Sequence, residues 1–313
     1  MMKNKHSIYL HRVGAIGDTL LTSNLLVHLK SCYKEPRISM GTIPNYALPL
    51  LKSGLISEII DATRVPYHLL DTPYSIQDAI TGELQKYDTV IIFKKDKNQI
   101  IKNRLKKTGI QDFAIESPFP PESSNIHVSK WLERVFKQLK HKKNKNDKPI
   151  KLSISKETSI SSASARKKLR LNSPYLALHP GSGSKKKCAP IKKIIKIAKE
   201  IVDSYNLKVA LIEGVADKTI CDEFRKNWPS KIINVKVNSL DILAGILVKA
   251  EGFLGCDSGI SHLSSLYGVP SLVLFGPHSN PIHWHPIGMR SEWTYWNNVN
   301  DCKIIFERLI KKN

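Results

Sequence analysis

The stretch from Gly255 to Pro277 constrains the fold of this chain most strongly, because it combines two strand-like segments with a helix start suited to an anion. An apolar run ends at Cys256, the polar turn Asp257-Ser258-Gly259 follows, and apolar residues then recur at helical spacing as far as Tyr267. A second apolar run completes a predicted β-α-β unit. Ligands of open α/β sheets bind at the carboxyl ends of the strands, where helix N-termini attract negative charge. The stretch therefore predicts a nucleotide-phosphate site.

The same residues also have ordinary structural explanations, and the spacing alone leaves these open. Asp257 or Ser258 could simply cap the helix, because both residue types accept hydrogen bonds from the first helical turn. His262 could be a hydrogen-bonded histidine of the core. Under the functional interpretation, Gly259 lets a ligand approach the backbone, and the N–H groups of the first turn bind it.

A second glycine-bearing turn lies near the amino terminus. Residues Ser7 to His11 are predicted as a buried strand, and the sequence RVGAIGD leads from it into a helix with leucines along one face. Gly14 and Gly17 form half of a dinucleotide fingerprint, but the third glycine is absent, so the pattern is weak evidence for a phosphate site. Asp18 follows, and it is either a helix-start residue or a general base above the sheet edge.

A third turn of this kind follows a strand predicted at Tyr175 to His179. The glycine-serine turn Pro180 to Ser184 leads into the lysine triplet Lys185-Lys186-Lys187, and Pro190 is predicted as the first-turn proline of a helix. The spacing is not that of a P-loop. The triplet is therefore either an anion-binding element or a solvated corner.

Strand and helix patterns alternate along the rest of the chain, which predicts an α/β fold with parallel sheets. A length of 313 residues suits two domains of ordinary size. The segment from Lys140 to Ser164 has almost no apolar periodicity, and residues 130–170 carry 14 basic and three acidic side chains. We therefore predict one domain at residues 1–165, with a basic linker at about 140–170, and a second domain at residues 166–313.

The net charge and the cysteines indicate the kind of partner and the cellular compartment that we expect for this protein. The formal net charge of +22 favours an anionic partner or surface, although half of the excess lies between residues 130 and 170. The five cysteines are scattered and form no C-x-x-C pair, which is typical of a reduced cytosolic chain. The sequence has neither a signal-peptide pattern nor the roughly twenty apolar residues of a membrane span. We expect a cytoplasmic protein whose membrane contact, if any, is peripheral.

Taken together and in order, four segments resemble one known family. The segments are RVGAIGDTLLTS at 12–23, HPGSGSKKKCAP at 179–190, NSL at 238–240 and DSGISHLSSLYGVPSLVLFGP from Asp257 onward. Their order and separation resemble the ADP-heptose:lipopolysaccharide heptosyltransferases, glycosyltransferase family nine, over essentially the full chain. The resemblance implies the GT-B architecture, with two Rossmann-like domains whose parallel sheets face each other across a cleft. It implies acceptor binding by the amino-terminal domain and nucleotide-sugar binding by the carboxyl-terminal domain.

The resemblance also implies roles for individual residues. Asp18 would be the general base, with Gly14 and Gly17 in its turn near the acceptor. Asp217 is only the nearest match to a family acid, because its spacing from Gly214 is one residue short. The implied donor-binding residues are Ser182, Lys187, Asp217, Asn238, Asp257, Ser258, Gly259 and His262.

Three departures from the family pattern leave the exact donor and acceptor open. Ala189 stands where the family usually has Trp, Asn24 where Pro is usual, and His278-Ser279-Asn280 where Thr-Asp often follows Gly-Pro.

The implied activity is an inverting, metal-independent transfer of heptose from ADP-heptose to an anionic lipopolysaccharide core or lipid A precursor, with no cofactor. The chain contains no D-x-D, so we expect Lys187 and the helix start after Asp257 to take the charge of the departing diphosphate. Two alternatives remain, a nucleotide-sugar epimerase on the same scaffold and a nucleic-acid-binding protein. The latter is the weaker one, because charge alone does not explain three glycine-rich turns after strands.

Overall fold

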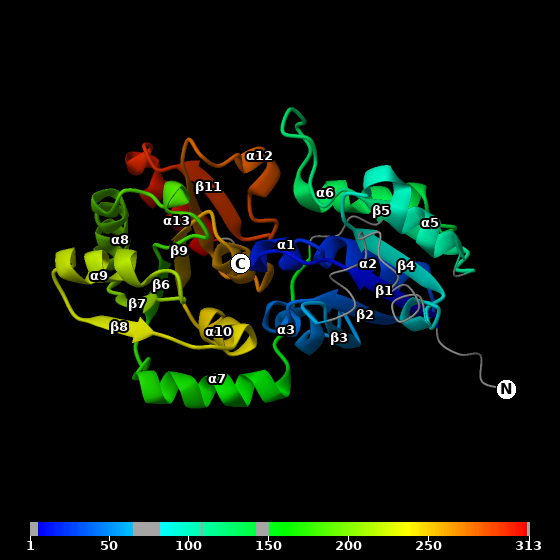
Figure 1. Ribbon diagram of the computed structural model, residues 1–313. Coiled ribbons are helices and arrows are strands. Elements are labelled where there is room, and N and C mark those ends of the chain that lie inside the picture. Colours follow the sequence, from blue (N-terminus) through cyan, green and yellow to red (C-terminus); the bar gives the residue numbers. More distant parts are fainter. Residues whose placement is uncertain (1–5, 65–81, 108, 142–149, 312–313) are drawn as a thin grey trace. The chain divides into compact units, whose positions relative to one another are not determined.

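The computed structural model describes residues 6–64, 82–107, 109–141 and 150–311, and it divides into two compact units, Met1–Lys148 and Pro149–Asn313 (Figure 1). Each unit contains one parallel sheet, as the alternating strand and helix patterns predict. The boundary between the units differs from the predicted one at residue 165. The functions predicted for the two domains remain predictions.

The described strands of the first unit form a sheet of order β3-β2-β1-β4-β5, in which all neighbours are parallel. Tyr9 in the central strand lies in register with Ser39 and Val90 of the strands on either side. All three side chains are buried, as expected for a parallel sheet. The strands are β1 (Ser7–His11), β2 (Arg37–Thr42), β3 (Glu58–Asp61), β4 (Thr89–Phe93) and β5 (Asp112–Glu116).

The single helix predicted after β1 is interrupted near Thr22, so that two helices follow one another. The Thr22 hydroxyl donates to the Thr19 carbonyl at 2.6 Å, and the Thr22 N–H bonds to the same carbonyl at 3.2 Å. This local hydrogen bonding competes with the regular helical pattern. The described helices of this unit are α1 (Ile16–Leu20), α2 (Ser23–Cys32), α3 (Pro44–Lys52), α5 (Ile100–Lys107) and α6 (Val128–Leu132), with 3₁₀ turns at Lys97–Gln99 and Glu133–Lys137.

The second unit contains a sheet of order β11-β10-β9-β6-β7-β8, again with all neighbours parallel. The β-α-β unit predicted around Gly255 to Pro277 is present as β9, α11 and β10, and β9 pairs with both β6 and β10. The strands are β6 (Tyr175–His179), β7 (Lys208–Ile212), β8 (Ile232–Val235), β9 (Gly252–Cys256), β10 (Ser271–Phe275) and β11 (Ser291–Tyr295).

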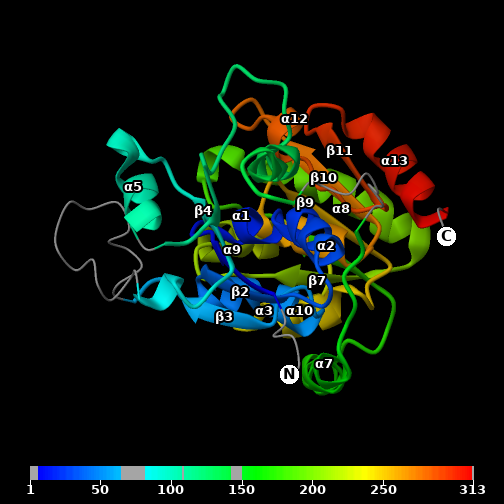
Figure 2. The same cartoon turned by 90° about the vertical axis from the view of Figure 1, so that its right-hand side faces the viewer.

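A continuous apolar core joins one face of this sheet to three helices. Ile194 and Ile197 of α8, Phe224 of α9 and Phe306 of α13 belong to the same buried cluster as the sheet residue Leu254. Figure 2 shows α13 alongside α8, and these two helices contact each other. The described helices are α7 (Lys156–Leu169), α8 (Ile191–Tyr205), α9 (Lys218–Asn227), α10 (Leu240–Leu247), α11 (Gly259–Leu266), α12 (Pro281–Trp284) and α13 (Val299–Lys311), with a 3₁₀ turn at Lys185–Lys187.

Helix α7 lies in the stretch that the sequence analysis assigned to a linker. Its packing uses small and polar side chains, so apolar periodicity could not reveal it. Thr158 and Ser162 are its buried residues, and a Cβ placed on Gly245 of α10 would lie 2.3 Å from the Ser162 hydroxyl. Because α7 packs this closely on α10, it belongs to the second unit.

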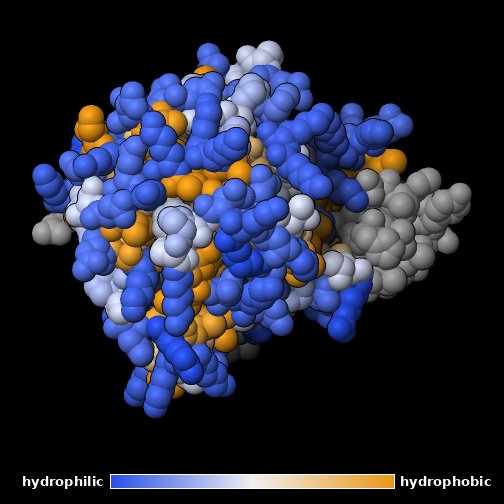
Figure 3. Space-filling view, turned by 90° about the vertical axis from the view of Figure 1, so that its left-hand side faces the viewer, coloured by the Kyte–Doolittle hydropathy of each residue, from blue (hydrophilic) through white to orange (hydrophobic). Residues whose placement is uncertain are grey.

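The surface carries the excess charge. Figure 3 shows one face of the molecule, on which hydrophilic residues dominate and apolar residues appear in scattered groups. This distribution is ordinary for a folded domain. No helix within the described ranges is both long and apolar enough to span a bilayer.

Candidate functional site

The turn after β9 starts helix α11, and Ser258 is its N-cap. The Ser258 hydroxyl accepts the N–H of Ser261 at 3.3 Å, while the Ser261 hydroxyl donates to the Cys256 carbonyl at 2.6 Å. The capping explanation therefore applies to Ser258, and it leaves the Asp257 carboxylate for other contacts. Gly259 is the first helical residue. The remaining N–H groups of this first turn are the ones that a bound anion can use.

Asp257 is the meeting point of several predicted residues. Its carboxylate accepts Lys187 Nζ at 2.9 Å and also the Ser279 hydroxyl, and its main-chain carbonyl accepts the Ser182 hydroxyl at 2.6 Å. The Asp257 side chain is only 6% exposed, whereas that of Lys187 is 33% exposed. The ammonium of Lys187 also lies 5.7 Å from the centre of the Trp284 ring. One buried carboxylate thus positions a lysine that solvent and a ligand can reach.

His262 lies in α11 and is almost fully buried. Burial lowers its pKa to about 4, and the charges of His285 and Lys187 act in the same direction, whereas Asp257 opposes them. The imidazole is therefore neutral at pH 7. Its Nδ1 has no hydrogen-bond partner among the described residues. A buried polar atom without a partner is uncommon in folded proteins, and a bound water, ion or ligand can complete it.

Asp217 is hydrogen-bonded to residues of two turns. His179 Nε2 lies 3.0 Å from its Oδ2, which also accepts the Gly214 N–H at 3.1 Å. His179 Nδ1 lies 3.2 Å from the Ser258 hydroxyl, so a hydrogen-bonded chain connects the turns after β6, β7 and β9. Burial raises the pKa of Asp217, but the His179 contact and the Gly214 N–H outweigh this and lower it below its ordinary value. Asp217 and His179 thus position the turns.

The two glycines of the Pro180–Ser184 turn differ in their surroundings, which gives a matched pair of variants. A Cβ at Gly181 would lie 2.0 Å from Asp217 Oδ1, whereas nothing lies within 4 Å of a Cβ at Gly183. Asp217 cannot easily yield because its Oδ2 is held by both His179 Nε2 and the Gly214 N–H. We expect Gly181→Ala to lower the free energy of unfolding by about 1–3 kcal/mol and to weaken donor binding.

Gly183→Ala should change the free energy of unfolding by less than about 0.5 kcal/mol. Urea denaturation of both variants checks the pair. Equal stability of the two would show that the turn adapts and that Gly181 is not needed for close packing.

Asn238 is exposed in the segment between β8 and α10. It follows the carboxyl end of β8, as the other turns follow their strands. Its role at the adenosine stays a prediction.

In the first unit, Asp18 lies in α1 and contacts a fully buried arginine. Its Oδ2 accepts the N–H of Ala15 at 2.8 Å, and its Oδ1 lies 3.6 Å from Nη2 of Arg12. A Cβ on Gly14 would lie 2.4 Å from Asp18 Oδ2, so glycine is required there. Asp18 therefore does bind the helix start, as its structural explanation requires. Its side chain keeps 13% exposure, so the other proposed role remains physically available.

Sequence reasoning missed Arg12 as the partner of Asp18. Arg12 donates from Nη1 to the Pro118 carbonyl at 2.8 Å, and its guanidinium carbon lies 4.8 Å from the centre of the Phe119 ring. Burial lowers its pKa, and the charge of Asp18 opposes this. The sequence signal that could have revealed this contact is the position of Arg12, a charged residue directly after the buried strand β1. Gly17 is the second residue of α1.

A family model decides what kind of protein these turns belong to. Residues 102–308 match the model of glycosyltransferase family 9 (heptosyltransferase), which is more than half of the chain. The chain belongs to glycosyltransferase family 9. This membership confirms the resemblance and the assignment as an enzyme, and it favours a glycosyltransferase over the epimerase and the nucleic-acid-binding protein.

Individual relatives agree with the family assignment. Lipooligosaccharide heptosyltransferase 2 of Campylobacter jejuni is 24% identical over 277 residues, covering 86% of this chain and 81% of the relative. A glycosyl transferase family 9 structure from Veillonella parvula has a TM-score of 0.75 at 18% identity, covering 100% of this chain and 92% of its own. The structure of E. coli ADP-heptose lps heptosyltransferase II has a TM-score of 0.73 at 14% identity, covering 97% and 98% respectively. These structures confirm the predicted GT-B fold class of two parallel-sheet α/β domains.

Proposed function

We propose that this chain transfers a heptose from ADP-heptose to a lipopolysaccharide core acceptor, with inversion at the anomeric carbon and without a divalent metal. The contacts around Asp257 at the start of α11 carry the proposal. Ser182 and Lys187 of the segment after β6 meet Asp257 of the turn after β9 at a helix N-terminus, which is an arrangement suited to a diphosphate. The heptosyltransferase names of the relatives, one of which includes ADP-heptose, support this choice of donor.

The donor diphosphate would be neutralised by this chain's own groups. Lys187 is bound to Asp257 without ligand, and its 33% exposure lets the ammonium turn toward a phosphate oxygen. The N–H groups of the first turn of α11 supply further donors. Because His262 is neutral, it can offer a hydrogen bond but no charge. These groups together make a metal unnecessary for holding the leaving group.

The transfer itself needs a base and a stabilised leaving group. We assign the base to Asp18, whose carboxylate takes the proton of the acceptor hydroxyl as that oxygen attacks the anomeric carbon. The bond from the anomeric carbon to the diphosphate breaks, and ADP leaves with the electron pair. Arg12 positions the Asp18 carboxylate through the 3.6 Å contact. Attack from the face opposite the departing ADP inverts the sugar carbon.

The acceptor is assigned as an anionic, membrane-held saccharide. The net charge of +22 favours such a partner and a peripheral contact with an anionic membrane surface.

A transfer assay tests the proposal. The purified chain should convert ADP-heptose and a heptose-deficient core acceptor into ADP and a heptosylated product, which mass spectrometry detects, at the same rate with and without EDTA. Loss of activity in EDTA would contradict the metal-free mechanism. Turnover with a UDP-sugar in place of ADP-heptose would contradict the donor, and formation of an isomerised sugar without acceptor would favour an epimerase.

A further inference from the structure

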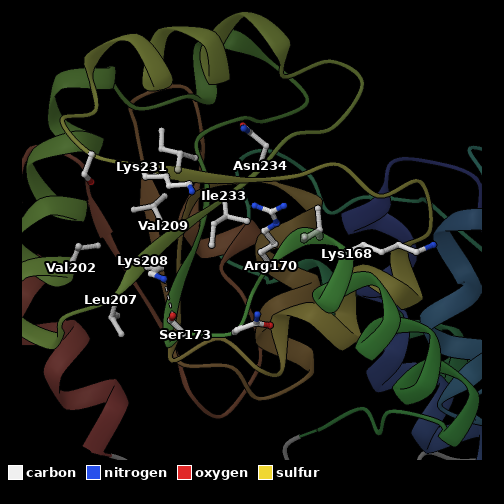
Figure 4. Close-up of a pocket in the computed structure, with 14 residues that line it drawn as sticks. Lys168, Arg170, Ser173, Val202, Leu207, Lys208, Val209, Lys231, Ile233 and Asn234 are labelled. Atoms are coloured by element: carbon white, nitrogen blue, oxygen red, sulfur yellow. Dashed lines mark hydrogen bonds between the residues drawn. The ribbon is translucent and has the colours of Figure 1, made fainter.

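The second unit has a surface cavity of about 710 Å³, whose lining residues Figure 4 shows. The end of α7, the amino ends of β7 and β8, and Val202 of α8 line it. The donor turns instead follow the carboxyl ends of β6, β7 and β9. Because the strands are parallel, the cavity lies at the amino ends of the strands and the donor turns lie at their carboxyl ends.

The cavity carries positive charge without compensation. Its lining includes four basic residues and no Asp or Glu, and none of the four has an ion-pair partner within the described part of the chain. Lys208 Nζ donates to the neutral Ser173 hydroxyl at 2.8 Å. Figure 4 shows Arg170 and Lys231 extending toward the same side of the cavity and Lys208 directed toward Ser173, whereas the fourth, Lys168, extends away.

Some basic residues elsewhere in this unit have acidic partners. Arg225 contacts Glu213 at 2.8 Å, and Arg308 contacts Glu292. The lining of the cavity offers no such partner to its basic residues.

Helix termination explains only part of this charge. Basic residues in the last turn of α7 complement the negative end of its dipole, which accounts for Lys168. Lys208 and Lys231 lie at the beginnings of strands, where no such dipole acts. Arg170 ends α7 with a left-handed backbone at φ 59°, a conformation that favours glycine or asparagine. The backbone thus gives no reason for an arginine at this position.

The floor of the cavity is apolar, with Leu207, Val209 and Ile233 between the basic side chains. An arginine and two lysines around such a floor suit a phosphate oxygen cluster attached to a less polar group. We propose that this cavity binds the phosphate group of a phosphate ester. A phospholipid headgroup and a soluble sugar or glycerol phosphate share this chemistry. The proposal goes beyond the transfer reaction, because it uses no residue of the donor turns.

The test compares two triple variants that lose the same charge. Arg170→Gln/Lys208→Gln/Lys231→Gln removes the pocket cations, and the control Lys196→Gln/Lys199→Gln/Lys226→Gln removes exposed lysines of α8 and α9. Both are made in the full chain carrying Lys187→Met, so that the cation of the donor turn does not contribute. Calorimetric titration with inorganic phosphate measures affinity, and sedimentation with phosphatidylcholine vesicles, with or without phosphatidylglycerol, measures lipid binding.

We expect the pocket variant to lose phosphate affinity about tenfold or more and the control less than twofold. Pocket-dependent sedimentation with phosphatidylglycerol identifies the ester as a lipid headgroup, whereas phosphate binding without sedimentation identifies a soluble ester. Equal losses in both triple variants, or no saturable binding of phosphate in the millimolar range, would overturn the proposal.

Arg170→Gly separates binding from folding. Glycine suits the left-handed backbone, so its melting temperature should equal or exceed that of the parent, while phosphate affinity falls severalfold. An affinity unchanged in this variant would remove Arg170 from the proposed site.

Discussion

Replacing Lys187 by methionine is expected to weaken ADP binding about tenfold or more and to slow heptose transfer by a larger factor. Lys187 is the cation that Asp257 presents from the turn after β6, with its Nζ 2.9 Å from the carboxylate. A charge-assisted contact to the diphosphate acts in the ground state and strengthens as ADP departs. The free energy of unfolding should also fall by about 1–2 kcal/mol, because the buried Asp257 carboxylate loses a donor.

The neighbouring lysine supplies the control for this variant. Lys186 belongs to the same triplet but is exposed, so Lys186→Met should leave stability, affinity and turnover nearly unchanged. Calorimetry with ADP and steady-state kinetics check both variants. If the two behaved alike, the triplet would be only a solvated corner. A second comparison, Lys187→Met in an Asp257→Asn background, should show almost no further loss of stability but still a loss of affinity.

Replacing Asp18 by asparagine is expected to reduce turnover by roughly a hundredfold or more while leaving the affinity for ADP unchanged. Asparagine keeps an acceptor for the Ala15 N–H, which Asp18 binds at 2.8 Å, but it cannot take the proton of the acceptor hydroxyl. The melting temperature should fall modestly, because the buried guanidinium of Arg12 loses its anionic partner. We expect ADP affinity to survive because the predicted donor ligands all come from the second unit.

A second substitution separates the chemical role of Asp18 from its structural one. Asp18→Ala removes the hydrogen bond from Ala15 as well and should cost about 1 kcal/mol more in stability than Asp18→Asn. Added formate should restore part of the turnover of Asp18→Ala, because a free carboxylate can enter the vacated space and accept the proton. An active Asp18→Asn enzyme would remove Asp18 from the mechanism and leave it as a helix-start residue.

Strands could be predicted from the sequence where a continuous apolar run is followed by a glycine-bearing turn. The buried runs at Ser7–His11 and Tyr175–His179 are strands with the predicted bounds, because both are continuous apolar segments closed by glycine-bearing turns. Prediction failed where packing is carried by small or polar side chains. Helix α7 packs through Thr158 and Ser162 and was therefore taken for a linker.

The short strands β5 and β11 were also missed. β5 begins at Asp112, whose buried carboxylate accepts the Thr89 hydroxyl at 2.7 Å across the sheet. β11 is an edge strand with Trp293 and Tyr295 exposed. Its Glu292 lies in register with the buried Leu272 of β10. Neither segment has a long apolar run. Only pairing with the adjacent strand makes these segments β-structure, and such tertiary pairing has no local signal.

Some contacts of the candidate site could likewise be predicted from the sequence, whereas others could not. Residue type and spacing predicted an anion site in the turn at Asp257, and the family resemblance singled out Lys187. The structure places the Lys187 Nζ 2.9 Å from the Asp257 carboxylate. His179 and Ser279 could not be predicted, because their contacts join segments distant in sequence. The resemblance implied Asp217 as a donor ligand, and its carboxylate is hydrogen-bonded to His179 and Gly214, so its role at the donor stays a prediction. Spacing locates a turn, whereas the direction of a side chain depends on its tertiary neighbours.

A crystal structure of the chain with ADP tests most directly whether the turn at the start of α11 holds the diphosphate of the donor. We predict that the diphosphate lies within about 3 Å of Lys187 Nζ and of N–H groups in the first turn of α11, with Lys187 turned away from Asp257. ADP bound elsewhere, or bound with Lys187 still held by Asp257 and out of reach of the phosphates, would contradict the account.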